Sequence, residues 1–207
     1  LDPLRIGTGW KKEDLGKVQV MVESTYGDSH PGSGHLNILV EEVRKGIAEE
    51  GGFGARYHCT DICDGESQGT DGINYSLASR EMIANMIEIH ANATPFDAGV
   101  YLSSCDKGVP GNLMGLARVN IPSVFVPGGT MNDWGTNLGM SSNMETSAKM
   151  IVDGSPMLFD IGKFNGKNFN YVAAFGAFTE IAYDTSQKLK KVIGQTAYGV
   201  TALRALM

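Results

Sequence analysis

The sequence has no long hydrophobic run, and this absence limits where the protein can act. No apolar stretch in the 207 residues approaches the roughly 18 residues that suggest a membrane-spanning helix. The start of the chain also lacks the pattern of a secretory signal peptide. We therefore expect a cytoplasmic protein with no membrane partner.

Positive charge is scarce as well. Lys and Arg number 17 against 23 Asp and Glu, and the formal net charge is −6. No cluster of lysine or arginine stands out, whereas nucleic-acid-binding surfaces concentrate such residues. We therefore expect no nucleic-acid partner. An anionic small-molecule substrate would need a local cation or metal, because the overall charge does not attract it.

Cysteines are few and odd in number. Cys59, Cys63 and Cys105 cannot all pair, and without a secretion signal reduced thiols are the better interpretation. Three thiols can ligate a metal, react chemically or fill the core. The glycine-rich segments also lack the phosphate-binding patterns G-x-G-x-x-G and G-x-x-x-x-G-K-[ST] between a strand and a helix, so the sequence carries no nucleotide signal.

The sequence does contain an alternation of strand-like and helix-like segments. The order β-α-β-α-β-α-β, with short connections, predicts a three-layer α/β sandwich: a mostly parallel sheet with helices on both faces. We interpret residues 1–17 as an arm, 1–131 as one α/β domain and 132–207 as a divergent continuation of that domain. Short apolar runs predict strands at 18–22, 55–62, 98–102 and 123–126, and helical spacing or helix signals predict helices at 36–50, 79–91 and 110–119, with Ser79 capping the second.

Polar, glycine-rich loops follow the first three predicted strands, at 24–35, 63–72 and 103–111. Right-handed crossovers would place these loops on one edge of the sheet. Open α/β folds bind ligands at that edge. We therefore expect the three loops to converge.

The third loop joins a thiol, a carboxylate and an amine in Cys105, Asp106 and Lys107. A cysteine at a helix N-terminus has a stabilised thiolate, which suits a metal or an iron–sulfur cluster. Asp106 offers oxygen to a hard cation such as Mg²⁺, and Lys107 can act as a general base or hold a carboxylate. The alternative for such a tripeptide is a solvated Asp-Lys pair beside a buried cysteine.

The other two loops hold weaker candidates. Asp64 offers a second carboxylate for the same cation, although an Asp-Gly turn is usually only a turn. Cys59 and Cys63 are four positions apart, about 13 Å in an extended strand, so a bend is needed before both reach one metal. His30 and His35 flank a Pro-Gly-Ser-Gly turn, where they can bind a metal or a substrate carboxylate or serve as polar residues before a helix.

Four motifs carry a family resemblance: GDSHPGSGHL (27–36), CDGESQGTDGINYSLASREMIA (63–84), CDKGVPGNLMG (105–115) and IPSVFVPGGTM (121–131). Taken together, they resemble the dihydroxy-acid dehydratase / phosphogluconate dehydratase family over roughly residues 7–131. CDKGVPGNLMG fits the family signature at every diagnostic position. The residues of the first two motifs are closer to the sugar-acid branch than to the branched-chain amino-acid enzyme.

The resemblance implies a hydro-lyase that removes water from a 2,3-dihydroxy carboxylic acid, such as xylonate or gluconate, to give a 2-keto-3-deoxy acid. It also implies a 2Fe–2S or 4Fe–4S cluster and Mg²⁺. Matching positions make Cys105 a cluster ligand, Asp64 and Asp106 Mg²⁺ ligands, and Lys107 the catalytic lysine of the metal site. The alternatives are a dihydroxy-acid dehydratase of branched-chain amino-acid biosynthesis and a truncated, non-catalytic relative that keeps only the fold.

The chain departs from the family pattern at two cluster positions. Gly32 stands where the family usually has its first cluster cysteine, and the weak match after Gly194 puts Tyr198 at the third. Cys59 or Cys63 is then a candidate substitute ligand. The family's second, β-rich domain is also expected to be absent. We further expect a homodimer that binds its hydroxy-acid substrate through Ser33 and His35.

Overall fold

A computed structural model of the chain describes residues 2–129, 136, 137, 139, 146 and 162–169, in two compact units that divide after Gly129. Segments expected to be helical or apolar beyond residue 170 lie outside the described residues. The elements, in chain order, are α1 (Asp2–Gly7), the 3-10 helix η1 (Lys12–Gly16), β1 (Gln19–Ser24), α2 (Leu36–Glu49), β2 (Phe53–His58), α3 (Asp64–Ser67), the 3-10 helix η2 (Asp71–Tyr75), α4 (Ser76–Ala93), β3 (Ala98–Ser103), α5 (Gly108–Arg118), β4 (Ser123–Pro127), β5 (Gly162–Phe164) and β6 (Lys167–Phe169).

The first unit is built on a four-stranded sheet in the order β2-β1-β3-β4, and all three pairings are parallel. In the register, Val22 of β1 lies opposite Arg56 of β2 and Val100 of β3. Every residue of β1 is buried, as expected for a central strand covered on both faces. The predicted parallel α/β sheet is confirmed.

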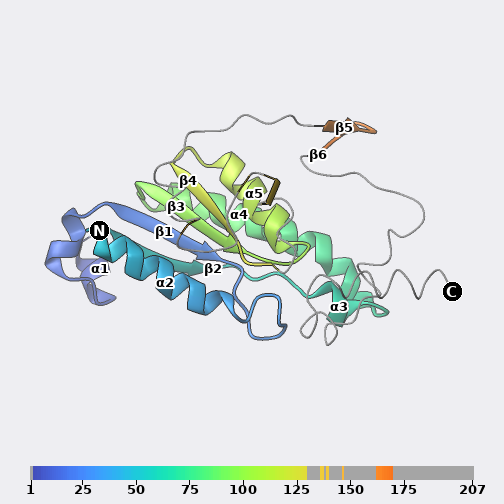
Figure 1. Cartoon of the computed structure of the whole chain (residues 1–207), viewed down its shortest axis with the longest axis horizontal. Coiled ribbons are helices and arrows are strands. Elements are labelled where there is room, and N and C mark those ends of the chain that lie inside the picture. The colour runs from blue at the N-terminus through green and yellow to red at the C-terminus, as the bar shows by residue number, and fades with distance from the viewer. Residues whose placement is uncertain (1, 130–135, 138, 140–145, 147–161, 170–207) are drawn as a thin grey trace. The chain divides into compact units, whose positions relative to one another are not determined.

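The helices cover both faces of this sheet. The crossover through α2 runs from β1 to β2, and those through α4 and α5 run in the opposite direction along the sheet. Right-handed crossovers therefore put α2 on one face and α4 with α5 on the other, as Figure 1 shows. The reversal lies between β1 and β3, so their carboxyl ends border the crevice in which such folds bind ligands.

Two glycines bring α5 close to α4. A Cβ atom on Gly115 would lie 2.8 Å from Cβ of Ile87, and one on Gly111 would lie 2.9 Å from Cβ of Ile83. Ile83 and Ile87 are fully buried. This close packing fixes α5 against α4, and with it the Cys105–Lys107 segment that leads into α5.

Several local predictions need correction. The segment expected to be an arm contains the helices α1 and η1. Asp14 stabilises η1, because its carboxylate accepts a hydrogen bond from the Lys11 N–H and pairs with Lys17 at 2.7 Å. Helix α4 begins at Ser76, not at Ser79, because η2 leads directly into it. The Ser79 hydroxyl instead donates to the Ser76 carbonyl.

In the second unit, the described residues 162–169 form an antiparallel hairpin of β5 and β6. Asn165 and Gly166 connect the strands, with φ of 48° and 77°. Two consecutive positive φ values define a type I′ turn, which Asn-Gly favours. Among the residues that the structure describes, no helix combines the length and apolar character that crossing a membrane requires.

Candidate functional site

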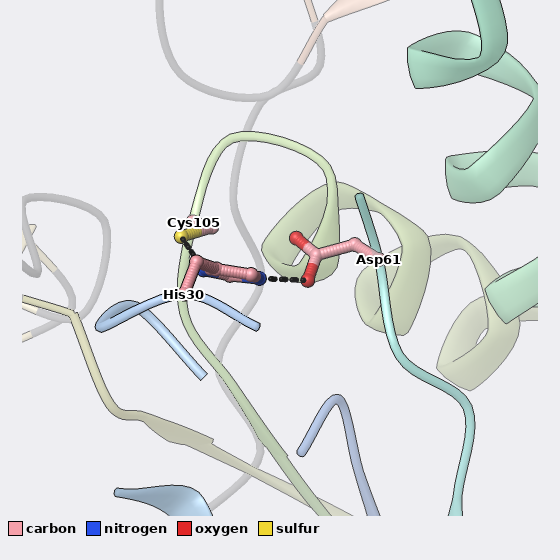
Figure 2. Close-up of side chains that lie close together, drawn as sticks. All are labelled: His30, Asp61 and Cys105. Atoms are coloured by element: carbon pink, nitrogen blue, oxygen red, sulfur yellow. Dashed lines mark hydrogen bonds and ion pairs between the residues drawn. The ribbon is translucent and has the colours of Figure 1, made fainter. Parts of the chain in front are cut away.

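Three side chains from three different strand ends meet at the carboxyl edge of the sheet. His30 comes from the loop after β1, Asp61 follows β2, and Cys105 follows β3. One candidate ligand atom from each residue lies within 4.8 Å of the others. Figure 2 shows the imidazole of His30 between the thiol of Cys105 and the carboxylate of Asp61. The expected convergence of the loops after β1 and β3 is therefore present.

The two nitrogens of His30 face different partners. Nδ1 lies 3.8 Å from Sγ of Cys105. Nε2 lies 2.9 Å from Oγ of Ser33 and 3.4 Å from Oδ1 of Asp61. The Ser33 hydroxyl donates its own proton to the Gly27 carbonyl at 3.0 Å, so both groups at Nε2 are acceptors. Nε2 therefore carries a proton, and Nδ1 points its lone pair at the sulfur when the ring is neutral.

Asp61 is buried beside the imidazole. Its side chain is 0% exposed and that of His30 is 1% exposed. Oδ2 of Asp61 accepts a hydrogen bond from the Gly108 N–H, the first residue of α5, and this carboxylate also complements the helix dipole. Hydrogen bonding to Asp61, followed by the effect of Cys105, raises the pKa of His30 to about 10. The raised pKa favours the protonated ring, whose charge the Asp61 carboxylate balances.

Cys105 has an unusual backbone conformation. Its φ is 66°, in the left-handed region that costs roughly 1–2 kcal/mol for a residue with a side chain. Such strain marks candidate functional positions. The neighbouring Ser104 hydroxyl donates to the Gly32 carbonyl, which ties the loop after β1 to the loop after β3.

Gly32 points at the same place as Cys105 and His30. A Cβ atom at position 32 would overlap Sγ of Cys105 and would lie 3.0 Å from Nδ1 of His30. Position 32 is where the family resemblance expects a cluster cysteine. A side chain at position 32 would therefore point toward Cys105, and the imidazole of His30 lies next to the same point.

A second cluster is formed around Asp64. Nζ of Lys107 lies 2.6 Å from Oδ2 of Asp64, and the Ser76 hydroxyl donates to Oδ1 at 2.6 Å. Lys107 and Asp64 are both mostly buried at the side chain, 14% and 12% exposed. Asp106, between Cys105 and Lys107, is exposed. The structure therefore pairs two of the three residues expected at the Mg²⁺ site.

The remaining candidates are two cysteines and a histidine. Cys59 and Cys63 are partly buried, and within the described residues neither joins the three-ligand group. Burial, then the charges of Glu23 and Asp61, raise the pKa of Cys59 to about 11, which disfavours its thiolate. His35 is exposed and its Nε2 bonds the Gly128 carbonyl at 2.8 Å.

The donors present fit the groups that the resemblance implies. A thiolate and an imidazole are ligands that iron accepts in clusters, and Nδ1 of His30 and Sγ of Cys105 lie 3.8 Å apart. The carboxylate of Asp64 is a hard oxygen ligand of the kind that Mg²⁺ prefers. Cys105 and His30 would hold iron, and Asp64, with Asp106 and Lys107 next to it in the chain or in space, would serve the Mg²⁺ site.

Asp61 was missed from the sequence. Residues 55–62 read as a continuous strand, which would have made Asp61 a strand residue of unknown orientation. Strand β2 ends at His58, so Asp61 turns back toward α5. The signal that would have found it is the cluster of polar residues around Asp61, which is unusual for the end of a buried strand.

Comparison with known proteins identifies the family of the chain. Residues 17–161 match the family model described as "Dihydroxy-acid/6-phosphogluconate dehydratase N-terminal". The chain is 45% identical over 123 residues to a dihydroxy-acid dehydratase of Vesicomyosocius okutanii, and 43% over 123 residues to one of Moorella thermoacetica; each match covers 59% of this chain and 22% of the relative.

A third relative extends the match slightly. A dihydroxy-acid dehydratase of Oleidesulfovibrio alaskensis is 39% identical over 138 residues, which are 67% of this chain and 25% of the relative. The chain therefore matches about a quarter of the length of these relatives. Because the family match covers most of the chain, this protein belongs to the dihydroxy-acid/6-phosphogluconate dehydratase family, a family of dehydratases, and matches its N-terminal domain.

Proposed function

We propose that the protein serves the dehydration of a 2,3-dihydroxy carboxylic acid to a 2-keto acid, with an iron–sulfur cluster and Mg²⁺. One observation carries this proposal: Cys105 and Lys107, two positions apart on one turn, contact different groups. Cys105 meets His30, and Lys107 meets Asp64. A single turn at the ligand-binding edge thus carries a thiolate for iron and an ammonium–carboxylate pair for Mg²⁺ and substrate.

In this reaction the substrate loses its 3-hydroxyl group and its C2 proton as water, and the resulting enol becomes the keto acid. When bound, the cluster and Mg²⁺ supply positive charge to the leaving hydroxyl and to the carboxylate. Lys107 supplies the local cation that the acidic chain otherwise lacks. Its ammonium, fixed by Asp64 at 2.6 Å, would hold the carboxylate end of the substrate.

The substrate class has two candidates. The residues of the first two motifs favour a sugar acid, whereas the relatives that align at 39–45% identity are named dihydroxy-acid dehydratase. We therefore place a branched 2,3-dihydroxy acid first and an aldonic acid such as gluconate or xylonate second. Exposed His35, at the end of the loop between β1 and α2, is the residue through which we expect either acid to be contacted. Ser33, expected to share that role, is buried, and its hydroxyl bonds the Gly27 carbonyl and Nε2 of His30.

The test is anaerobic reconstitution of the full chain with iron and sulfide, followed by assay of 2-keto acid. The substrates are 2,3-dihydroxyisovalerate, D-gluconate and D-xylonate, each with Mg²⁺. We expect keto acid from the first, and its loss in Asp64→Asn but not in the exposed control Asp71→Asn. A bound cluster without keto acid from any substrate would favour the alternative, a relative that keeps the fold without catalysis.

The same preparation tests the substitute ligands. Loss of iron in Cys59→Ser or Cys63→Ser would support a cluster role for that thiol. Retention of iron in both would remove the hypothesis. The expected homodimer is tested separately, by measuring the molar mass of the protein particle in solution.

A further inference from the structure

We propose that His30 is a metal ligand: Nδ1 of His30 and Sγ of Cys105 bind the same iron. This inference rests on the proposed function, because it names how the iron of that site is held. The observation behind it is that ligand atoms of His30, Asp61 and Cys105 all lie within 4.8 Å of one another.

The separation of the two atoms fits a shared metal. A tetrahedral ion bound by sulfur at about 2.3 Å and by nitrogen at about 2.0–2.1 Å holds these two atoms about 3.6 Å apart. Nδ1 of His30 and Sγ of Cys105 are 3.8 Å apart before any ion is bound. A metal can therefore enter between them with only a small adjustment of either side chain.

The other nitrogen of His30 is arranged as in established metal sites. Histidines that bind metals usually donate their second N–H to a carboxylate or another acceptor, which fixes the tautomer and the ring orientation. Nε2 of His30 faces Oδ1 of Asp61 and the hydroxyl of Ser33. Asp61 lies across the imidazole from the sulfur in Figure 2, so it is a positioning residue rather than a ligand.

Asp61 is itself held in place for this task. Its Oδ2 accepts the N–H of Gly108 at 3.0 Å, and its buried Oδ1 faces Nε2 of His30 at 3.4 Å. One oxygen therefore fixes the carboxylate to α5, and the other orients the imidazole. This pairing leaves Nδ1 of His30 directed at Cys105.

Gly32 leaves room for both candidate ligand atoms. A Cβ atom at position 32 would overlap Sγ of Cys105 and would lie 3.0 Å from Nδ1 of His30. The absence of a side chain at this position therefore lets the thiol and the imidazole lie next to each other.

The test uses the full chain, reconstituted anaerobically with iron and sulfide and then reduced, with pulsed EPR to detect ¹⁴N hyperfine coupling to the cluster. We expect a strong coupling from a directly bound imidazole. It should disappear in His30→Ala and return as ¹⁵N coupling when ¹⁵N-imidazole is added to that variant. His35→Gln, in the same loop, is the matched control and should keep the coupling.

Three results would overturn the proposal: a reduced cluster without strong nitrogen coupling, a coupling that survives His30→Ala, or an unsubstituted chain that retains no iron. The proposed function fails in a different way. A nitrogen-coupled cluster together with no keto acid from any offered substrate would contradict the dehydration and leave the ligand assignment standing.

Discussion

Oδ2 of Asp61 accepts a 3.0 Å hydrogen bond from the backbone N–H of Gly108, which ties the end of β2 to the start of α5. The same carboxylate faces Nε2 of His30 through its other oxygen, at 3.4 Å. One buried side chain thus sets both the position of the Cys105 turn and the orientation of the imidazole.

Replacing Asp61 with Asn should therefore weaken iron binding. Loss of a carboxylate behind a metal-bound histidine typically lowers affinity about 10–100-fold, and we expect a loss of that size, measured by competition with a chelator. The neutral amide also removes a charge from the N-terminus of α5, at a cost of about 1 kcal/mol in unfolding free energy. Asp28→Asn, exposed in the loop after β1, is the control. Equal iron affinity in both variants would refute the role of Asp61.

The left-handed backbone of Cys105 leads to a stability prediction for the metal-free chain. Because glycine adopts φ of 66° without strain, Cys105→Gly should be more stable than Cys105→Ala by about 1–2 kcal/mol. The pair is compared by urea unfolding. At the exposed position 78 of α4, the preference should reverse: Ala78→Gly should be less stable than the unsubstituted chain, since glycine weakens helices. An alanine variant as stable as the glycine variant would show that the turn relaxes.

The contact between α4 and α5 predicts that Gly115→Ala is destabilising. Its new Cβ would lie 2.8 Å from Cβ of Ile87, and overpacking of this kind costs about 1–3 kcal/mol. Gly46→Ala in α2 is the matched control, because its Cβ would meet nothing within 4 Å. We expect that substitution to stabilise the chain by about 0.4–1 kcal/mol. Thermal or urea unfolding that gave the two variants the same sign would contradict the packing.

A buried carboxylate away from the site predicts a pH dependence. Burial raises the pKa of Glu23 on β1, despite its 2.9 Å bond to Nδ1 of His90. The groups around it include Tyr101 opposite on β3 and Tyr57, which packs on the His90 ring. A carboxyl group whose pKa is raised in the folded state stabilises that state at pH values below its ordinary pKa of 4.5. This stabilisation is lost as the pH rises through the pKa of the group in the folded state.

Relative to Glu23→Gln, the unsubstituted metal-free chain should therefore lose unfolding free energy as pH rises above about 4.5. Urea unfolding of both proteins from pH 4.5 to 8 measures this difference. The exposed Glu42→Gln should run parallel to the unsubstituted chain across the range. A gap between the unsubstituted chain and Glu23→Gln that stays constant with pH would show that Glu23 titrates normally.

The sequence predicts the sheet well because its signals are local. The alternation of apolar runs with helical spacing is enough to give parallel strands and the start of α2 at Leu36. Cys105, Lys107 and Asp64 also stand out, because each follows a predicted strand. The pairing of His30 with Asp61 does not, since it depends on β2 ending at His58, and the polar residues around Asp61 are only a weak signal of that end. The predicted start of α4 was wrong for a similar reason. The Ser76 hydroxyl bonds Asp64, and this contact between residues 12 positions apart leaves no local pattern in the sequence.

The most direct measurement of the central claim is keto acid formation by the anaerobically reconstituted chain with 2,3-dihydroxyisovalerate. The proposed dehydration predicts a 2-keto acid that requires Mg²⁺ and is lost in Cys105→Ser, whose hydroxyl cannot replace the thiolate at iron. A chain that holds its cluster and yet forms no keto acid from this substrate, gluconate or xylonate would contradict it.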